Sequence, residues 1–157
     1  MDIVIQLIVA FTGSMGFCLL FQVRKERLFL ASLGGFISWG VYLLLGTVAT
    51  QDVPRYFFAA VVVSIYAEIL ARIVKCPATL YLIGGSIPLI PGGSLYRSMS
   101  YFMNQDFAAF SGQALYTVLL AMAIAVGLLF PMSVFQVIQR SRKLWTEWRL
   151  KEKTSNI

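Results

Sequence analysis

The sequence contains no histidine, only two cysteines and few charged residues, which occupy 13% of its 157 positions. Because histidine is the commonest general base and metal ligand, its absence argues against catalytic triads and metal-dependent catalysis. Cys18 lies inside an apolar stretch and Cys76 at the end of another, which is neither a metal-ligand pattern nor a disulfide framework. The sequence therefore predicts a protein that is not an enzyme and that uses no metal or other cofactor.

The shortage of charge places the chain among membrane proteins. Soluble domains carry about 25% charged residues, whereas 59% of this chain is hydrophobic. A helix needs roughly 17 apolar residues to cross a hydrocarbon core of about 30 Å. Four stretches exceed that length: residues 3–23, 28–50, 56–74 and 107–130. The first begins at Asp2 and ends in a basic run, the reverse of a secretory signal, so we expect a retained helix.

Residues 78–102 are also apolar, but Gly84-Gly85-Ser86 and Pro88-Leu89-Ile90-Pro91-Gly92-Gly93 interrupt them. Proline removes a backbone donor, and glycine tolerates conformations that other residues avoid, so a continuous helix is not expected. Half-helices over 78–87 and 94–102 would be about 15 and 13 Å long at ~1.5 Å per residue, which places the break near the bilayer midplane. The sequence predicts an all-α integral membrane bundle of about five transmembrane helices, the fourth broken.

Apolar and basic residues alternate after Pro131, which we expect to mark a kink or the end of the regular part of the fifth span. This pattern predicts a basic amphipathic helix that rests at the cytoplasmic interface, or alternatively binds a partner. The expected division is a transmembrane domain over 1–136 and a basic tail over 137–157.

Lys and Arg outnumber Asp and Glu by 13 to 7, and in the predicted topology eleven of these cations share one side. They are Arg24, Lys25, Arg27, Arg72, Lys75, Arg140, Arg142, Lys143, Arg149, Lys151 and Lys153. Only Arg55 and Arg97 remain for the other side. The positive-inside rule then places the amino terminus outside and the carboxyl terminus in the cytoplasm. We therefore read the basic surplus as an orientation signal, with no role in nucleic-acid binding.

The broken span is the main candidate for a binding site. Irregular backbone at membrane depth persists only where protein buries it or where it lines a wet cavity, and half-helix ends form substrate sites in transporters. Ser94 is predicted to cap the second half-helix, leaving the amides of residues 95–97 to face an anion. The candidate solute-binding residues are Pro88, Pro91, Gly92, Gly93, Ser94 and Arg97. The alternative is a kink that serves only packing.

Glu68 is the second candidate, with Arg72 one turn further along the same span. A charge at mid-helix costs about 2.5–3.5 kcal/mol on insertion scales, so such groups usually face the bundle interior. Glu68 is interpreted either as a protonatable group that faces a solute pathway or as the ion-pair partner of an Arg72 that reaches the headgroups.

Other features predict helix packing. Small residues recur at four-residue spacing, which favours close helix approach: Ala10, Ser14 and Cys18; Ala31 and Gly35; Gly34 and Ser38. Gln113 and Thr117 form a mildly polar strip, and Trp39, Tyr42 and Tyr56 are interpreted as ordinary membrane-protein aromatics.

The run Pro88-Leu89-Ile90-Pro91-Gly92-Gly93-Ser94-Leu95-Tyr96-Arg97, with five spans, a basic first loop and a basic tail, resembles the carboxyl-terminal half of the threonine/serine exporter family. The resemblance covers roughly residues 3–143. It implies a subunit in the bacterial inner membrane that exports threonine and serine, or a dicarboxylate such as succinate. It also implies a larger multi-span partner subunit, while self-assembly into a homo-oligomer stays open.

Two functions of different classes follow. In the first, the broken span and Arg97 hold the carboxylate of a small solute, and Glu68 is the coupling acid. In the second, the chain is a scaffold or accessory subunit of the lipid bilayer that stabilises another protein and binds no solute.

Overall fold

A computed structural model describes residues 2–155 as α-helices joined by short turns, with no strand in that range. The elements are α1 (Ile3–Leu20), α2 (Lys25–Leu45), α3 (Asp52–Val74), α4 (Ala78–Ser86), the 3-10 turn η1 (Ile87–Leu89), α5 (Gly92–Met103) and α6 (Phe107–Ser155). Four helices are long and apolar enough to cross a membrane, and 78–89 with 92–103 form a helix pair bent by 52°, which is either a broken fifth span or a re-entrant loop. The predicted all-helical fold with four to five candidate membrane spans is confirmed, and the helix is interrupted in the segment where a break was predicted.

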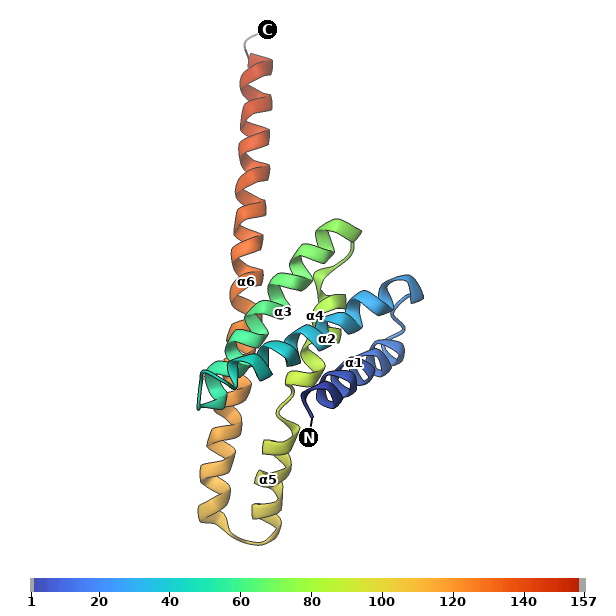
Figure 1. Cartoon of the computed structure of the whole chain (residues 1–157). Helices are drawn as coiled ribbons and strands as arrows, with labels where there is room; N and C mark the ends of the chain where they lie inside the picture. Colours follow the sequence, from blue (N-terminus) through green and yellow to red (C-terminus); the bar gives the residue numbers. More distant parts are fainter. Residues whose placement is uncertain (1, 156–157) are drawn as a thin grey trace.

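The helices form a crossed bundle with two extensions (Figure 1). α1–α4 pack around one another, and α3 lies against the middle of α6. α5 packs mainly against the first part of α6, and this α5–α6 hairpin extends beyond the bundle at one end. At the other end α6 continues alone toward the carboxyl terminus, on the side where the α1–α2 and α3–α4 turns lie.

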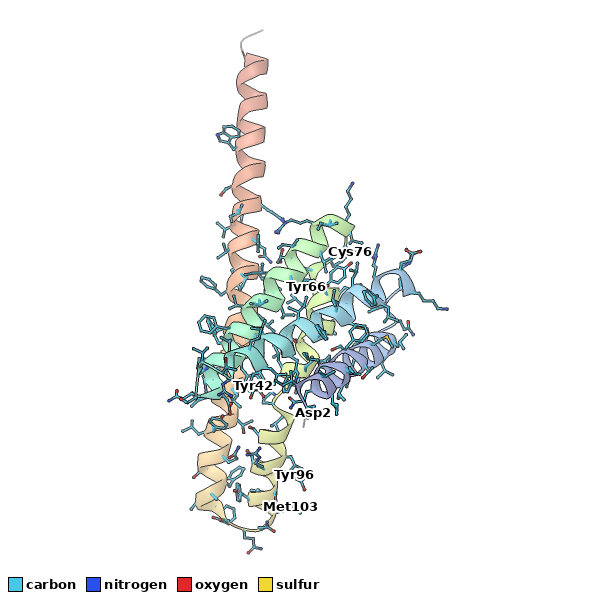
Figure 2. All side chains as sticks on the ribbon, in the orientation of Figure 1. Asp2, Tyr42, Tyr66, Cys76, Tyr96 and Met103 are labelled. Atoms are coloured by element: carbon cyan, nitrogen blue, oxygen red, sulfur yellow. The ribbon has the colours of Figure 1, made fainter. Side chains whose placement is uncertain are left out.

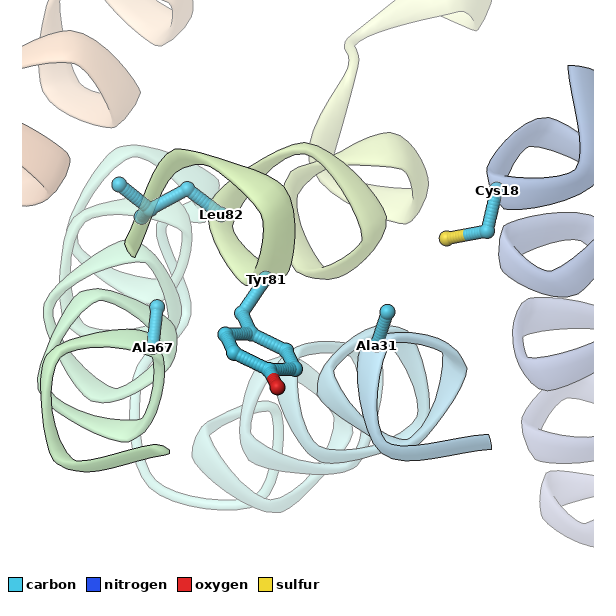
Figure 3. Packing of buried hydrophobic residues seen from close by; sticks show 5 residues of the cluster. All are labelled: Cys18, Ala31, Ala67, Tyr81 and Leu82. Carbon is cyan, nitrogen blue, oxygen red and sulfur yellow. The ribbon is translucent and has the colours of Figure 1, made fainter. Parts of the chain in front are cut away.

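Small residues let α4 sit in the centre of the bundle. A Cβ added to Gly84 would lie 2.7 Å from the Ala31 carbonyl oxygen, and one on Gly35 would collide with the Ser14 hydroxyl. The predicted small-residue positions on α1 and α2 are all buried. Tyr81 of α4, fully buried, inserts between α2 and α3 (Figure 3). The close approach predicted from the small-residue spacing is confirmed.

Pro131 was expected to mark either a kink or the end of the regular helix, and the second alternative is wrong, because α6 runs through this residue. Proline at this position removes the donor for the Gly127 carbonyl, four residues earlier, and a serine of a neighbouring helix bonds to the next carbonyl along the chain. Ser64 of α3 donates a hydrogen bond of 2.8 Å to the Leu128 carbonyl, in the turn that precedes the proline. Gly127, whose added Cβ would lie 2.7 Å from the Phe57 carbonyl oxygen, keeps the two helices close.

The tail is helical but is not a separate element. α6 contains 49 residues, so it is about 73 Å long at ~1.5 Å per residue, more than twice the hydrocarbon thickness. The predicted boundary at 136/137 falls inside this helix. Most side chains after residue 141 lie outside the described part of the chain, so the interfacial position of the tail stays a prediction.

The packing of α4 gives a first prediction. Gly84→Val should destabilise the protein by about 1–3 kcal/mol, the usual cost of overpacking, because its Cβ would meet the backbone of α2. Gly112→Val is the matched control, since a Cβ there meets nothing within 4 Å. Thermal unfolding in detergent, followed by size-exclusion chromatography, measures both, and equal melting temperatures would contradict the packing described.

Candidate solute-binding site

The break in the fourth span is a proline-centred turn. Pro91 has φ −78° and ψ 56°, and the Gly92 amide donates to the Ile90 carbonyl at 2.7 Å. These values define an inverse γ-turn, the three-residue turn in which the central residue takes this conformation. The turn bends the helical path by 52°, and α5 starts directly after it.

The expected capping role of Ser94 is wrong. α5 begins at Gly92, its N-cap position is Pro91, and no side chain caps it. The Leu95 amide is already paired, because it donates to the Pro91 carbonyl at 3.1 Å. The open amides of the first turn are therefore those of Gly93 and Ser94, two residues earlier than predicted. The Pro91 carbonyl accepts the first hydrogen bond of α5, and the Ser94 side chain does not cap this helix.

A cavity of about 300 Å³ lies at this turn. All six predicted residues of the broken span line it: Pro88, Pro91, Gly92, Gly93, Ser94 and Arg97. The remaining lining residues come mostly from α2, α3 and α6: Trp39, Tyr42, Asp52, Tyr56, Ile90, Gln113, Tyr116 and Leu120. The structure thus joins the predicted residues in one site, together with a second group that sequence reasoning missed.

Gly92 and Gly93 differ from the packing glycines of the bundle. Neither has a positive φ, and a Cβ on either would meet nothing within 4 Å. Backbone conformation and packing inside this chain therefore do not require glycine at these positions. Without side chains, both residues leave the first amides of α5 accessible from the cavity.

Asp52 is the main residue that sequence reasoning missed. We expected it in a turn, but α3 begins at Asp52, four residues before the predicted span. Its Oδ1 accepts from the Tyr42 hydroxyl at 3.2 Å, and its Oδ2 accepts from the Tyr116 hydroxyl at 2.8 Å. The Asp-Val-Pro sequence, with an acidic residue and a proline in a first turn, is the local signal that could have placed the helix start here.

Arg55 holds the turn between α2 and α3. Its Nη1 lies 3.3 Å from Asp52 Oδ1, and its Nε donates to the Ala49 carbonyl at 2.7 Å. A further bond of 3.4 Å reaches the Gly46 carbonyl. Arg97, by contrast, lines the cavity and is exposed. Of the two arginines predicted outside the main basic group, only Arg97 therefore belongs to the site.

Aromatic rings form another part of the wall. The ring of Tyr42 stacks on Trp39 at a centroid distance of 4.8 Å and lies 4.7 Å from the ring of Tyr56. Figure 2 shows Tyr42 at the end of the bundle from which the α5–α6 hairpin extends, with Tyr96 and Met103 farther along it. The interpretation of these aromatics as ordinary membrane residues missed their shared position at the cavity.

The two residues of the predicted polar strip, Gln113 and Thr117, have different surroundings in the structure. Gln113 lines the cavity. Thr117 is buried and lies 3.1 Å from the Ser98 hydroxyl, so this pair fastens α5 to α6.

Glu68 lies elsewhere. It is buried, and its Oε2 accepts from Arg72 at 3.0 Å. The guanidinium of Arg72 also lies 4.2 Å from the centre of the Phe135 ring on α6. Glu68 is sixteen residues along α3 from Asp52, about 24 Å at ~1.5 Å per residue, and it does not line the cavity. The contact with Arg72 agrees with the interpretation of Glu68 as an ion-pair partner. The role of Glu68 as a coupling acid stays a prediction.

Comparison with known proteins decides the family, because residues 6–134 match the family described as Threonine/Serine exporter, ThrE. The chain belongs to the threonine/serine exporter family. The match includes α2–α5, most of α1, α6 as far as Val134 and every residue that lines the cavity. No curated protein and no solved structure matches the chain.

The family resemblance inferred from the broken span is therefore confirmed, and the chain is a multi-pass protein of a membrane exporter family. Among the described residues, no group of three or more His, Cys, Asp or Glu side chains could hold a metal ion.

The contacts of Asp52 give a second prediction. Tyr116→Phe removes the hydrogen bond to Oδ2 and should cost about 1 kcal/mol of stability. Tyr96→Phe, at a side chain that is 75% exposed, is the control and should change stability by less than about 0.5 kcal/mol. Denaturant or thermal unfolding of both variants tests this, and a Tyr116→Phe protein as stable as wild type would show that the bond contributes nothing.

Proposed function

We propose that this chain is a subunit of an exporter for small carboxylate-bearing metabolites, and that the cavity at the Pro91 turn binds the carboxylate. One observation carries the proposal: the open first turn of α5 and the guanidinium of Arg97 line the same cavity at the break of a membrane span. A helix amino terminus carries about half a positive charge, and arginine can bind a carboxylate through two parallel hydrogen bonds.

The membrane setting supports an anionic solute. In a low-dielectric surrounding, a full cation beside a helix amino terminus strongly favours an anion. The charges of Asp52 and Arg55 offset each other, because the two side chains form an ion pair. Of the two charged residues that line the cavity, Asp52 and Arg97, Arg97 is therefore the one whose charge is not offset in this way. The solutes that fit are threonine and serine or a dicarboxylate such as succinate, moved without chemical conversion, so no enzymatic activity is proposed.

A partner subunit completes this proposal. Peptide groups at membrane depth must be covered by protein or water, yet α5 packs mainly against α6 and Arg97 is exposed. A larger multi-span subunit of the same family would cover the open side of the cavity, and a second copy of this chain is the alternative. The bilayer supplies the remaining surface.

We also propose the bacterial inner membrane, with the amino terminus outside. The basic α1–α2 turn and the α3–α4 turn lie on the side toward which the carboxyl-terminal part of α6 extends (Figure 1). Under the positive-inside rule this side is cytoplasmic.

Adding a methyl group at the open amides tests the site. Gly93→Ala should leave stability unchanged or raise it by up to about 1 kcal/mol, because alanine favours helix. Binding of labelled threonine or succinate should nevertheless weaken about tenfold, since the methyl group crowds the anion. Gly112→Ala, an open position of α6 outside the cavity, is the matched control. If wild type, bound to its partner, binds none of these solutes, the scaffold function replaces the exporter.

The charge of Arg97 is tested separately. Arg97→Gln should weaken carboxylate binding by about 1.5–3 kcal/mol, the usual contribution of a hydrogen bond to a charged group, which is roughly tenfold to a hundredfold. Arg97→Lys should retain part of the affinity, because it keeps the charge and loses the two-point geometry. Export from cells and binding by purified protein should fall together, and unchanged export at normal protein levels would remove Arg97 from the site.

A further inference from the structure

A cleft of about 350 Å³ lies between the α1–α2 turn and the start of α4, at the end of the bundle that Cys76 marks in Figure 2. It shares no lining residue with the Pro91 cavity. Most of its lining is apolar: Phe21, Val23, Pro77, Leu80 and Ile83, with Gln22, Arg24 and Thr79 as the polar members. Phe21 and Ile83 are 57% and 40% exposed, so the cleft is open to the surroundings of the bundle.

The two turns that frame the cleft have a defined backbone geometry. α1 and α3 each end in a Schellman motif, in which an amide bonds to the carbonyl five residues earlier. The Val23 amide donates to the Cys18 carbonyl, and the Cys76 amide donates to the Ala71 carbonyl, each at 3.0 Å. In both motifs the residue before the donor is left-handed, with φ of 55° and 53°. Hydrogen-bonded helix ends therefore form this part of the wall.

The residues around the cleft carry a positive charge that the chain does not neutralise. The two turns and the first residues of α2 contain four basic residues and one acidic residue: Arg24, Lys25, Glu26, Arg27 and Lys75. Arg24 lines the cleft, and Arg27 lies within electrostatic reach of Tyr81 in α4. Within the described part of the chain, both ion pairs lie on α3. Arg24 therefore has no carboxylate partner among the described side chains.

The cleft lies at the depth of lipid headgroups. α1 has 18 residues and none of them is charged, so it is about 27 Å long at ~1.5 Å per residue, close to the hydrocarbon thickness of about 30 Å. The turn that follows α1 therefore lies where acyl chains give way to headgroups. Apolar lining residues and the guanidinium of Arg24 meet at this boundary.

We propose that this cleft binds an anionic phospholipid, with its phosphate at Arg24 and one acyl chain along Phe21, Leu80 and Ile83. Arginine binds phosphate through two parallel hydrogen bonds, and basic pockets between membrane helices bind anionic headgroups. A free phosphate ion would leave the apolar lining without a partner, and a choline headgroup would bring a further cation to the basic turns. The bound lipid fills the gap between α1 and α4 and so fastens α1 to the bundle.

Lipid binding to the delipidated protein tests this site. The protein is purified in detergent, with its partner subunit if they copurify, and receives phosphatidylglycerol, phosphatidylcholine or inorganic phosphate. Native mass spectrometry counts the bound lipids, and thermal unfolding measures stabilisation, because a ligand of the folded state raises the melting temperature. We expect one phosphatidylglycerol to bind about tenfold more tightly than phosphatidylcholine, and inorganic phosphate neither to stabilise the protein nor to displace the lipid.

Two matched pairs of variants locate the lipid. Arg24→Gln should weaken phosphatidylglycerol binding about tenfold, because it removes the charged donor to the phosphate. Arg140→Gln removes the same charge at an exposed position of α6 outside the cleft, and should change the affinity by less than about twofold.

Ile83→Trp should narrow the cleft and weaken lipid binding severalfold. Ile73→Trp, the same substitution at a 71% exposed position outside the cleft, should not. Unfolding curves recorded without lipid confirm that each variant is folded.

The results distinguish the lipid from other occupants. The proposal is overturned if phosphatidylcholine binds as tightly as phosphatidylglycerol, or if Arg24→Gln lowers the affinity no more than Arg140→Gln does. Displacement of the lipid by inorganic phosphate would instead mark a site for a free anion. Lipid that binds the isolated chain but not its complex with the partner subunit would assign the cleft to a protein contact. None of these results concerns carboxylate binding at the Pro91 cavity, so the two proposals are tested independently.

Discussion

A peptide group inside a bilayer has no water to bond with, so every interruption of a membrane helix needs another partner for its backbone. The Pro91 turn is such an interruption. The Gly92 amide is paired inside the turn, and the amides that follow open into a cavity walled by four other segments of the chain. Polar side chains from distant helices lie around the turn, where they can shelter these groups.

The glycines illustrate how the bundle supports this arrangement. Gly35 and Gly84 let backbones of α1, α2 and α4 touch, because a Cβ at either position would overlap a neighbour. They fix the first half of the broken span in the centre of the bundle. Gly92 and Gly93, in the second half, touch nothing within 4 Å of an added Cβ. The same residue type therefore serves rigid packing before the turn and backbone access after it.

The two acidic residues of α3 show a parallel contrast. Glu68 is buried and bound to Arg72, which itself packs on an aromatic ring of α6; this arrangement joins α3 to α6. Asp52 also joins helices, through two tyrosines, but its carboxylate remains partly exposed to the cavity. A charge in the middle of a span, the feature that drew attention to Glu68, does not distinguish a satisfied ion pair from a group that can receive a ligand. The arrangement of the hydrogen-bond donors around each carboxylate does distinguish the two cases.

Apolar length and proline–glycine interruptions are local properties of the chain, so they were enough to predict the four long spans, the broken apolar segment and the six residues around its break. Reasoning from the sequence misplaced the start of α5 by two residues, since the bond from the Leu95 amide to the Pro91 carbonyl is one that no local pattern reveals. It also left open whether Pro131 ends the helix, which in the structure continues through this residue. Only the tertiary structure brought Tyr42, Asp52 and Tyr116 together. Asp52 and Tyr116 are 64 residues apart, and helix crossing, rather than spacing along the chain, decides which of their side chains meet.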